Sequence, residues 1–445
     1  MVELDKKFVR LRWPVLIMIC LASFGMLYFL SLLYPLKETL IEEFSFTNYD
    51  FGFVFSVYAI PSIFLLMGIF AGILIDRFGA RITGFVFSVL LIIGVLIIVY
   101  ATTEFFNKGG PFYSIFDSFW QECSPAAKLM AVGLFFFGMG GESLFLVMTR
   151  LIINWFKGRE IALAFALSYT FGKLGSSAGI ALTPILKNAI NWQFSLYVGL
   201  VVFLFTILAF NLLFILKKFN PKIDNESEDT PFKIKDLRHL IKAPIFIIFI
   251  LVAVAFYAAY DPLIVFGSDL LKNEYLLSLE QSTQEISFLL ILTALFSPVF
   301  GYLVDKKGLG YLFLIIGSFL LLIVFTLLLL DVAYPTVLMF IAGLALSLFA
   351  SSIYPVIASS VDKRISGTAF GVISSAENLG SWVATLSIGY LIEIFNPKIG
   401  MQMDQLKMMT YDYSSVEILI IGFMALCVLF SILIYRNRSK KVELK

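Results

Sequence analysis

Two opposite charges, Glu142 and Lys173, lie inside otherwise apolar runs of the sequence, at 131–155 and 161–186. The midpoint of the two positions falls in the polar turn 157–160, which joins the runs. If both runs are helices folded back on each other, the charges share one height, roughly 20 Å from the turn, near the middle of a hydrocarbon layer about 30 Å thick. Each charge there costs on the order of 3 kcal/mol or more, so such residues usually pair, face a cavity and serve a function. We predict that they mark a binding site.

A zwitterion needs an anion for its ammonium group and a cation for its carboxylate, and Glu142 and Lys173 supply both. The alternative is a structural salt bridge between two helices. We favour binding, because buried ion pairs often contribute little net stability. Arg150 lies on nearly the same helical face as Glu142, about 12 Å closer to the turn, and we assign it to a gate.

Two further acids, Asp261 and Glu377, lie in apolar runs of the second half, which contain no basic residue to neutralise them. Tyr257 and Tyr260 precede Asp261 and are expected to stack on a bound side chain or to hydrogen-bond a carbonyl. Burial and mutual repulsion favour the protonated form of a carboxyl. We hypothesise that one of the two acids couples transport to protons. The alternative is that one of them faces a wet vestibule without a specific role.

The composition is that of an all-α membrane protein. Hydrophobic residues make up 60% of the chain and charged residues 14%, the mean hydropathy is +0.93, and long uncharged runs recur from end to end. The net charge of +2 indicates no nucleic-acid partner. The single histidine and three unpaired cysteines provide no metal site and no disulfide framework. No catalytic constellation is visible, so we expect no cofactor and no enzymatic activity.

Apolar runs predict twelve transmembrane helices in two six-helix lobes. The long polar break divides the chain into an N-terminal lobe at 1–216, a linker at 217–243 and a C-terminal lobe at 244–445. This is the usual layout of two-lobed secondary transporters. Lysine and arginine are concentrated in one set of alternating loops, in the linker and at both ends. The positive-inside rule therefore places both termini in the cytosol.

An internal repeat supports two lobes. The pattern Gly-x-x-x-Asp-basic-x-Gly occurs at 72–79 and at 301–308, each time after the second helix of a six-helix unit. Here the sequence resembles the major facilitator superfamily, whose signature loop has this pattern. The resemblance implies a cytosolic latch that holds one conformation, formed by Asp76, Arg77, Arg81, Asp305 and Lys306. The alternative is a plain pair of tight basic turns.

Further segments resemble one branch of that superfamily, whose members carry dipeptides. They include 140–144, 155–160 and 172–176. The resemblance implies a dipeptide carrier that works by alternating access, with Glu142 and Lys173 holding the two peptide termini. The sequence departs from the branch in two places. Lysine stands where arginine is expected, and it cannot form a bidentate fork on a carboxylate. Glu377 stands where a neutral amide is expected.

Other functions stay open. A proton-coupled transporter of another small solute, such as an organic acid or a sugar, is the main alternative, and a non-transporting sensor with a carrier fold is another. We expect a monomer whose partners are a small solute, the lipid bilayer and, in the coupled case, protons. No acidic-dileucine signal lies near either end, and the loops predicted to be extracytosolic lack sequons. These features favour a bacterial plasma membrane, with a lysosomal membrane as the alternative.

Overall fold

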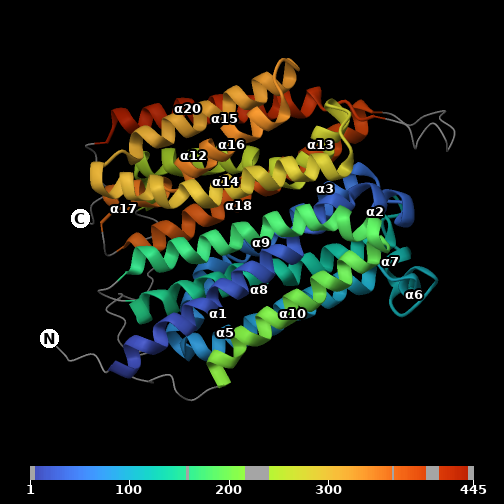
Figure 1. The fold of residues 1–445 in the computed structure, drawn as a ribbon, viewed down its shortest axis with the longest axis horizontal. Helices are drawn as coiled ribbons and strands as arrows, with labels where there is room; N and C mark the ends of the chain where they lie inside the picture. Colours follow the sequence, from blue (N-terminus) through green and yellow to red (C-terminus); the bar gives the residue numbers. More distant parts are fainter. Residues whose placement is uncertain (1–5, 157–159, 216–239, 363–364, 397–409, 439–445) are drawn as a thin grey trace.

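The computed structural model describes residues 6–156, 160–215, 240–362, 365–396 and 410–438. Every regular element in these ranges is a helix, and no β-strand forms there. Long helices run side by side along the molecule (Figure 1). Within the described residues, nine helical segments are long and apolar enough to cross a membrane. The predicted all-helical membrane protein is therefore confirmed, whereas the count of twelve spans stays a prediction.

Up to residue 215, the described residues form ten α-helices. They are α1 (Lys6–Ser31), α2 (Lys37–Phe44), α3 (Asn48–Val57), α4 (Ile60–Phe64), α5 (Met67–Ala101), α6 (Glu104–Asn107), α7 (Tyr113–Asp117), α8 (Pro125–Phe156), α9 (Ile161–Ala189) and α10 (Trp192–Ile215). Within this half, α8 packs chiefly against α5, and α1 packs against α9 and α10.

The second half begins after the residues 216–239, which lie outside the described ranges. Its helices are α12 (Pro244–Val265), α13 (Gly267–Glu274), α14 (Leu279–Lys307), α15 (Gly310–Leu329), α16 (Pro335–Ala350), α17 (Ile353–Ser360), α18 (Ser366–Phe395) and α20 (Ser414–Arg436). The two halves meet where α3 packs on α18 and α9 packs on α14. The predicted linker at 217–243 falls largely on the residues not described, so the lobe boundaries stay a prediction.

The molecule has two distinct ends. Helix α1 begins and α20 ends on the left of Figure 1, and we call this side the terminal end. Helices α2 and α13 lie on the right, at what we call the distal end. The positive-inside rule predicts that the terminal end is cytosolic.

The repeated loop motif ends at a glycine with positive φ in both copies, although the two glycines differ in ψ. Gly79 has φ +79° and ψ 156° and interrupts α5, while Gly308 has φ +64° and ψ 28° and caps the end of α14 in the left-handed conformation. Glycine adopts a positive φ without the steric cost that a Cβ adds. The second glycine of each motif is therefore required by the turn that it makes.

The segments that lead into the two loop motifs begin alike but differ before they reach the motif. We call these segments, 47–79 and 278–308, the two copies of the repeat. A capping box starts each one, with Thr47 before α3 and Ser278 before α14. From there α14 continues without a break to Gly308, whereas the first copy is interrupted after α3 and again at Leu66, which has φ +48°. The first copy is thus built from short segments, and the second is one long helix.

Candidate functional site

Glu142 lies on α8 and accepts a hydrogen bond from Tyr58, which directly follows α3. Gly138, one helical turn earlier on α8, allows close approach, since a Cβ there would lie 2.1 Å from the carbonyl oxygen of Tyr58. The Tyr58 hydroxyl donates a hydrogen bond to Glu142 Oε1 at 3.0 Å. The sequence did not single out Tyr58, because nothing in its local pattern indicates which helix it meets.

Lys173 reaches from α9 to the other half of the chain. Its Nζ donates a hydrogen bond to the Tyr260 hydroxyl of α12. The same ammonium lies 4.8 Å from the ring centroid of Tyr260 and 5.3 Å from that of Tyr169, a favourable arrangement of a cation on aromatic faces. In the described part of the chain no ion pair joins Lys173 to Glu142. Each predicted charge instead has its own tyrosine partner.

Glu377 of α18 is buried, with 8% of its surface exposed. Tyr354 of α17 donates a hydrogen bond to Glu377 Oε2 at 3.0 Å. No group of the described residues hydrogen-bonds the other oxygen, Oε1. Tyr257, which forms an edge-to-face contact with Tyr260, interacts electrostatically with Glu377. A buried carboxyl with one unpartnered oxygen is costly unless a proton or a ligand completes it.

Asp261 links these groups. It is half-buried on α12, within hydrogen-bonding reach of Ser381 on α18 and within electrostatic range of Lys173. Glu142 interacts electrostatically with Asp261, and Glu377 interacts with both. The structure therefore gathers the four predicted charges from both halves, and we call Glu142, Lys173, Asp261 and Glu377 the central site.

The central site holds three carboxyl groups and one ammonium group. Together with the hydroxyls of Tyr58, Tyr260 and Tyr354, they present both donors and acceptors between the two halves. Over the described ranges, no three His, Cys, Asp or Glu side chains are grouped as a metal ion requires. The arrangement suits a solute with separated positive and negative groups.

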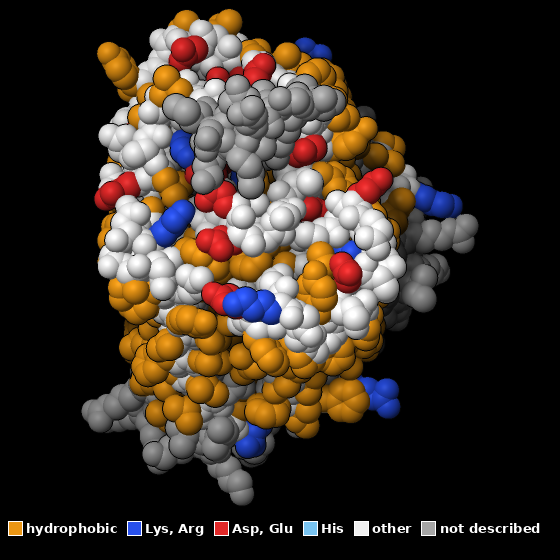
Figure 2. Space-filling model, turned by 90° about the vertical axis from the view of Figure 1, so that its right-hand side faces the viewer, with side chains coloured by type: hydrophobic (Ala, Val, Ile, Leu, Met, Phe, Trp, Pro, Cys, Tyr) orange, Lys and Arg blue, Asp and Glu red, His pale blue; other side chains and the backbone are white. Residues whose placement is uncertain are grey.

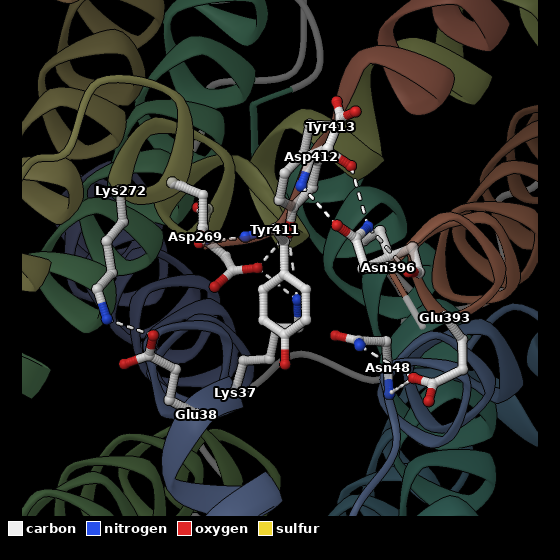
Figure 3. Close-up of polar contacts among 12 residues, drawn as sticks. Lys37, Glu38, Asn48, Asp269, Lys272, Glu393, Asn396, Tyr411, Asp412 and Tyr413 are labelled. Atoms are coloured by element: carbon white, nitrogen blue, oxygen red, sulfur yellow. Dashed lines mark hydrogen bonds and ion pairs between the residues drawn. The ribbon is translucent and has the colours of Figure 1, made fainter. Parts of the chain in front are cut away.

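A second set of charges, at the distal end, was not indicated by the sequence. Lys37 of α2 is only 2% exposed. It forms an ion pair with Asp269 of α13, and the Tyr413 hydroxyl donates a hydrogen bond to the same carboxylate. Lys37 Nζ also donates to the Tyr413 hydroxyl at 3.2 Å and lies 4.8 Å from the ring centroid of Tyr411. Figure 3 shows these side chains converging.

Two flanking contacts join the halves at the same end. Lys272 pairs with Glu38, and the Asn48 side chain donates a hydrogen bond to Glu393 Oε2 at 2.9 Å. Figure 2, which faces the distal end, shows acidic and basic side chains spread over it. We call the Lys37–Asp269–Tyr413 cluster and these two contacts the distal lock. Its contacts between the halves join residues more than 230 positions apart, so local sequence patterns do not reveal it.

A family model of the major facilitator superfamily matches residues 18–385 and 271–445. The chain belongs to the major facilitator superfamily. It is therefore a multi-pass membrane transporter and not an enzyme. The lysosomal dipeptide transporter MFSD1 of Danio rerio is 26% identical over 411 residues, which cover 88% of this chain and 82% of that protein. The Homo sapiens protein of the same name is 27% identical over 396 residues, with coverage of 86% and 80%.

Solved structures of the superfamily share the fold. The nucleoside transporter NupG has a TM-score of 0.70 at 15% identity and covers 95% of this chain and 99% of its own. A bacterial homologue of the human lysosomal transporter Spinster, in an inward-facing and unoccupied conformation, has a TM-score of 0.69 at 16% identity, with 98% of both chains covered. At these identities the likeness concerns the fold alone.

The superfamily's signature loops lie at the terminal end. Arg77, Arg81, Asp305 and Lys306 are exposed there. Lys306 Nζ donates to the Tyr302 hydroxyl of its own helix at 3.0 Å. The predicted gating residues Asp76 and Arg150 complete this set: the Asp76 side chain lies outside the described residues, and Arg150 is half-buried on α8. The latch that the resemblance implies stays a prediction.

Proposed function

We propose that this transporter moves dipeptides, or similar small zwitterions, by alternating access between its two halves. The observation that carries the proposal is the separation of Glu142 from Lys173, each bonded to a neutral tyrosine. Two buried charges that neutralised each other would have little left for a solute. Here the anion and the cation each retain charge that a zwitterion can satisfy.

The two termini of a dipeptide match these groups. The ammonium of the solute pairs with Glu142, and its carboxylate pairs with Lys173. Lysine binds a carboxylate as a point charge, so the plane of the carboxylate is not fixed as an arginine fork would fix it. The relatives named as dipeptide transporters support the assignment, because their alignments span most of this chain.

Alternating access requires that the distal lock opens. In the structure this end is closed by contacts between the halves, through Lys37–Asp269 and Lys272–Glu38. Solute entry from the distal side must separate these pairs. Binding energy released at the central site is available to offset that cost, since a ligand shifts a two-state equilibrium by its differential affinity.

Proton-coupled transport of another organic solute, such as an organic acid or a sugar, is the second candidate. The observation that favours it is Glu377 Oε1, which is buried and has no partner among the described residues. A proton on this oxygen would make it a donor and remove its charge. Asp261 interacts electrostatically with Glu377, so either acid is a candidate proton carrier.

Counterflow of labelled dipeptides into proteoliposomes tests the first proposal. We expect dipeptides, and not single amino acids, to drive exchange, and we expect Glu142→Gln and Lys173→Ala each to slow it by about tenfold or more. Matched controls are Glu280→Gln and Lys108→Ala, which change exposed charges at the distal end. Unchanged dipeptide exchange in both central variants would remove these residues from the site.

A pH gradient tests coupling. If Glu377 or Asp261 carries a proton, the rate of solute uptake will depend on the pH gradient across the membrane. The uptake will also change the pH inside the liposomes. Uptake that is indifferent to the gradient, with no change in internal pH, would favour uniport. The Glu377→Gln variant should then transport like the parent protein.

We further propose a bacterial plasma membrane as the location, because the loops predicted to be extracytosolic lack glycosylation sequons. The relatives are named as lysosomal transporters, so a lysosomal membrane is the alternative. Fractionation of the native source, followed by detection of the chain in plasma-membrane or lysosomal fractions, decides between them.

A further inference from the structure

A separate group of acids lies at the distal end of the second half. Its centre is Glu417, in the first turn of α20, whose surface is only 1% exposed. Within the described residues no group hydrogen-bonds Glu417 Oε1. The Tyr275 hydroxyl is likewise buried without a partner there, and it interacts electrostatically with Glu417. Two buried polar groups without a hydrogen-bond partner are costly, so each requires an explanation, such as a bound proton or water.

Three more acids surround Glu417. Glu274 ends α13, Asp331 follows α15, and Asp412 precedes α20, and all three interact electrostatically with Glu417. Burial raises the pKa of Glu274, and the hydrogen bonds from the Ser414 hydroxyl and backbone N–H lower the pKa of Asp412. Asp412 therefore keeps its negative charge beside Glu417.

The two lysines of the distal lock are already engaged. Lys37 pairs with Asp269, and Lys272 pairs with Glu38. Glu393, the acid that α18 contributes at this end, accepts hydrogen bonds from Asn48. Burial also raises the pKa of Tyr275 to about 12, so this tyrosine adds no charge. No grouping of acids in the described ranges fits a metal ion. The ligand that fits a buried carboxyl among acids is a proton.

This acid cluster and the distal lock share Tyr413. Glu274 Oε1 accepts a hydrogen bond from the Tyr413 backbone N–H at 2.9 Å. The Glu417 backbone N–H donates to the Tyr413 carbonyl oxygen at 3.0 Å, and the Tyr413 hydroxyl donates to Asp269 in the lock. Figure 3 shows Tyr413 reaching toward Asp269. A change in the first turn of α20 thus acts directly on a residue of the lock.

We propose that Glu417 binds a proton from the distal side and that this proton holds the distal lock closed. With the proton bound, Glu417 is neutral and can lie near Glu274 and Tyr275 without electrostatic repulsion. Without it, Glu417 repels Glu274, Asp331 and Asp412, which pushes the start of α20 away from α13. Tyr413 then leaves Asp269, and the lock loses one of its three central members.

Cross-linking at the rim of the lock measures the closed form. Glu38→Cys with Lys272→Cys places thiols where an ion pair now joins the halves, and a short bifunctional methanethiosulfonate links them when the end is closed. The native cysteines, Cys20, Cys123 and Cys427, are buried. A proton held tenfold more tightly in the closed form lowers the closed-to-open ratio by about tenfold as the distal pH rises through the titration.

We expect the cross-linking yield to fall as the distal pH rises from about 5 to about 9, a range that reaches the raised pKa values found for buried carboxyls. Glu417→Gln, which imitates the protonated acid, should keep the yield high throughout. Glu280→Gln, an exposed acid at the same end, should follow the parent protein. A parent yield that ignores pH, or a Glu417→Gln profile identical to the parent profile, would overturn the proposal.

A milder variant guards against misfolding of Glu417→Gln. Asp331 is exposed, and Asp331→Asn removes one repelling charge, so the proton should leave Glu417 at lower pH and the midpoint should move downward. A midpoint that stays in place would contradict the assigned cluster. The readout needs no solute, so its failure leaves the dipeptide proposal intact, and the failure of dipeptide exchange leaves this one intact.

Discussion

The distal lock and the central site both contain a lysine from the first half that reaches into the second half. Lys37 meets an acid, Asp269, whereas Lys173 meets a phenol, Tyr260. At the distal end each of the two lysines in the lock has its own carboxylate, while three acids face one lysine in the central site. Matched charges hold the halves together. Unmatched charges leave room for a solute or a proton.

The two lysines therefore differ in what their removal costs. Removing one partner of a buried ion pair strands a charge and costs about 3–5 kcal/mol. Removing a cation from a phenol leaves a neutral group, whose unmade hydrogen bond costs about 1–3 kcal/mol at most. Substitutions in the lock should therefore lower the stability of the fold, whereas substitutions in the central site should lower the rate of transport.

The largest expected effect is on stability, in Lys37→Met. The stranded Asp269 carboxylate, 7% exposed in the ion pair, should lower the free energy of unfolding by about 3–5 kcal/mol. Thermal unfolding of the purified protein measures this. The double variant Lys37→Met with Asp269→Leu should recover most of the loss, because neither charge remains. A single variant as stable as the parent would show that the lock does not hold the halves together.

Next in size is the effect of Lys173→Met on transport. The lost charge-assisted hydrogen bond to the solute carboxylate is worth about 1.5–3 kcal/mol, or a decrease of about 10- to 150-fold in kcat/KM. The thermal midpoint should change little. Zero-trans dipeptide uptake and thermal unfolding, measured on the same preparation, check the expected loss of transport and the expected unchanged stability. A large loss of stability with normal uptake would show that Lys173 holds the halves together and does not bind the solute.

Tyr58→Phe should have a smaller effect. It removes the hydroxyl that donates to Glu142 at 3.0 Å and preserves the ring. A single hydrogen bond contributes about 0.5–1.5 kcal/mol, so uptake should change by roughly two- to tenfold. Glu142 without its donor is freer to pair with a solute ammonium, so we expect KM to fall and not to rise. Tyr49→Phe, which alters an aromatic outside the central site, is the matched control.

The smallest effect is expected for Asp412→Asn, at the exposed margin of the lock. Hydrogen bonds from Ser414 lower the pKa of Asp412. A lowered pKa means that the carboxylate stabilises the fold above its ordinary pKa of about 3.9 and that this contribution is lost as the pH falls through the lowered value. The variant should be slightly less stable than the parent at neutral pH and equal to it in strong acid. Unfolding curves at several pH values test this, and an equal deficit at all pH values would contradict it.

A residue whose type differs from its immediate surroundings can be recognised in the sequence. Glu142, Lys173, Asp261 and Glu377 are charges in apolar runs, and the structure brings all four together, while their role in binding stays a prediction. The helical fold follows from the length and hydropathy of those runs. These features are local, and a linear pattern contains them.

The partners of these charges could not be predicted, because they depend on which helices pack together. Glu142 and Lys173 are near each other in sequence, yet α8 packs chiefly on α5, while α9 packs on α1 and α14. Each charge consequently meets a tyrosine far away in the sequence. Lys37 resembled an ordinary loop lysine, and only the fold brings it to Asp269, 232 positions later.

The segmented first copy of the repeat has a consequence for how the molecule moves. Helix α14 is continuous and has a single proline, Pro298, inside it, whereas the chain interrupted at Tyr58 and at Leu66 can bend at both of those joints. Tyr58 is itself the donor to Glu142. Bending at the first joint would therefore withdraw the phenol from the carboxylate as one half rocks against the other. The same backbone interruption that bends the helix would release the acid for a new partner.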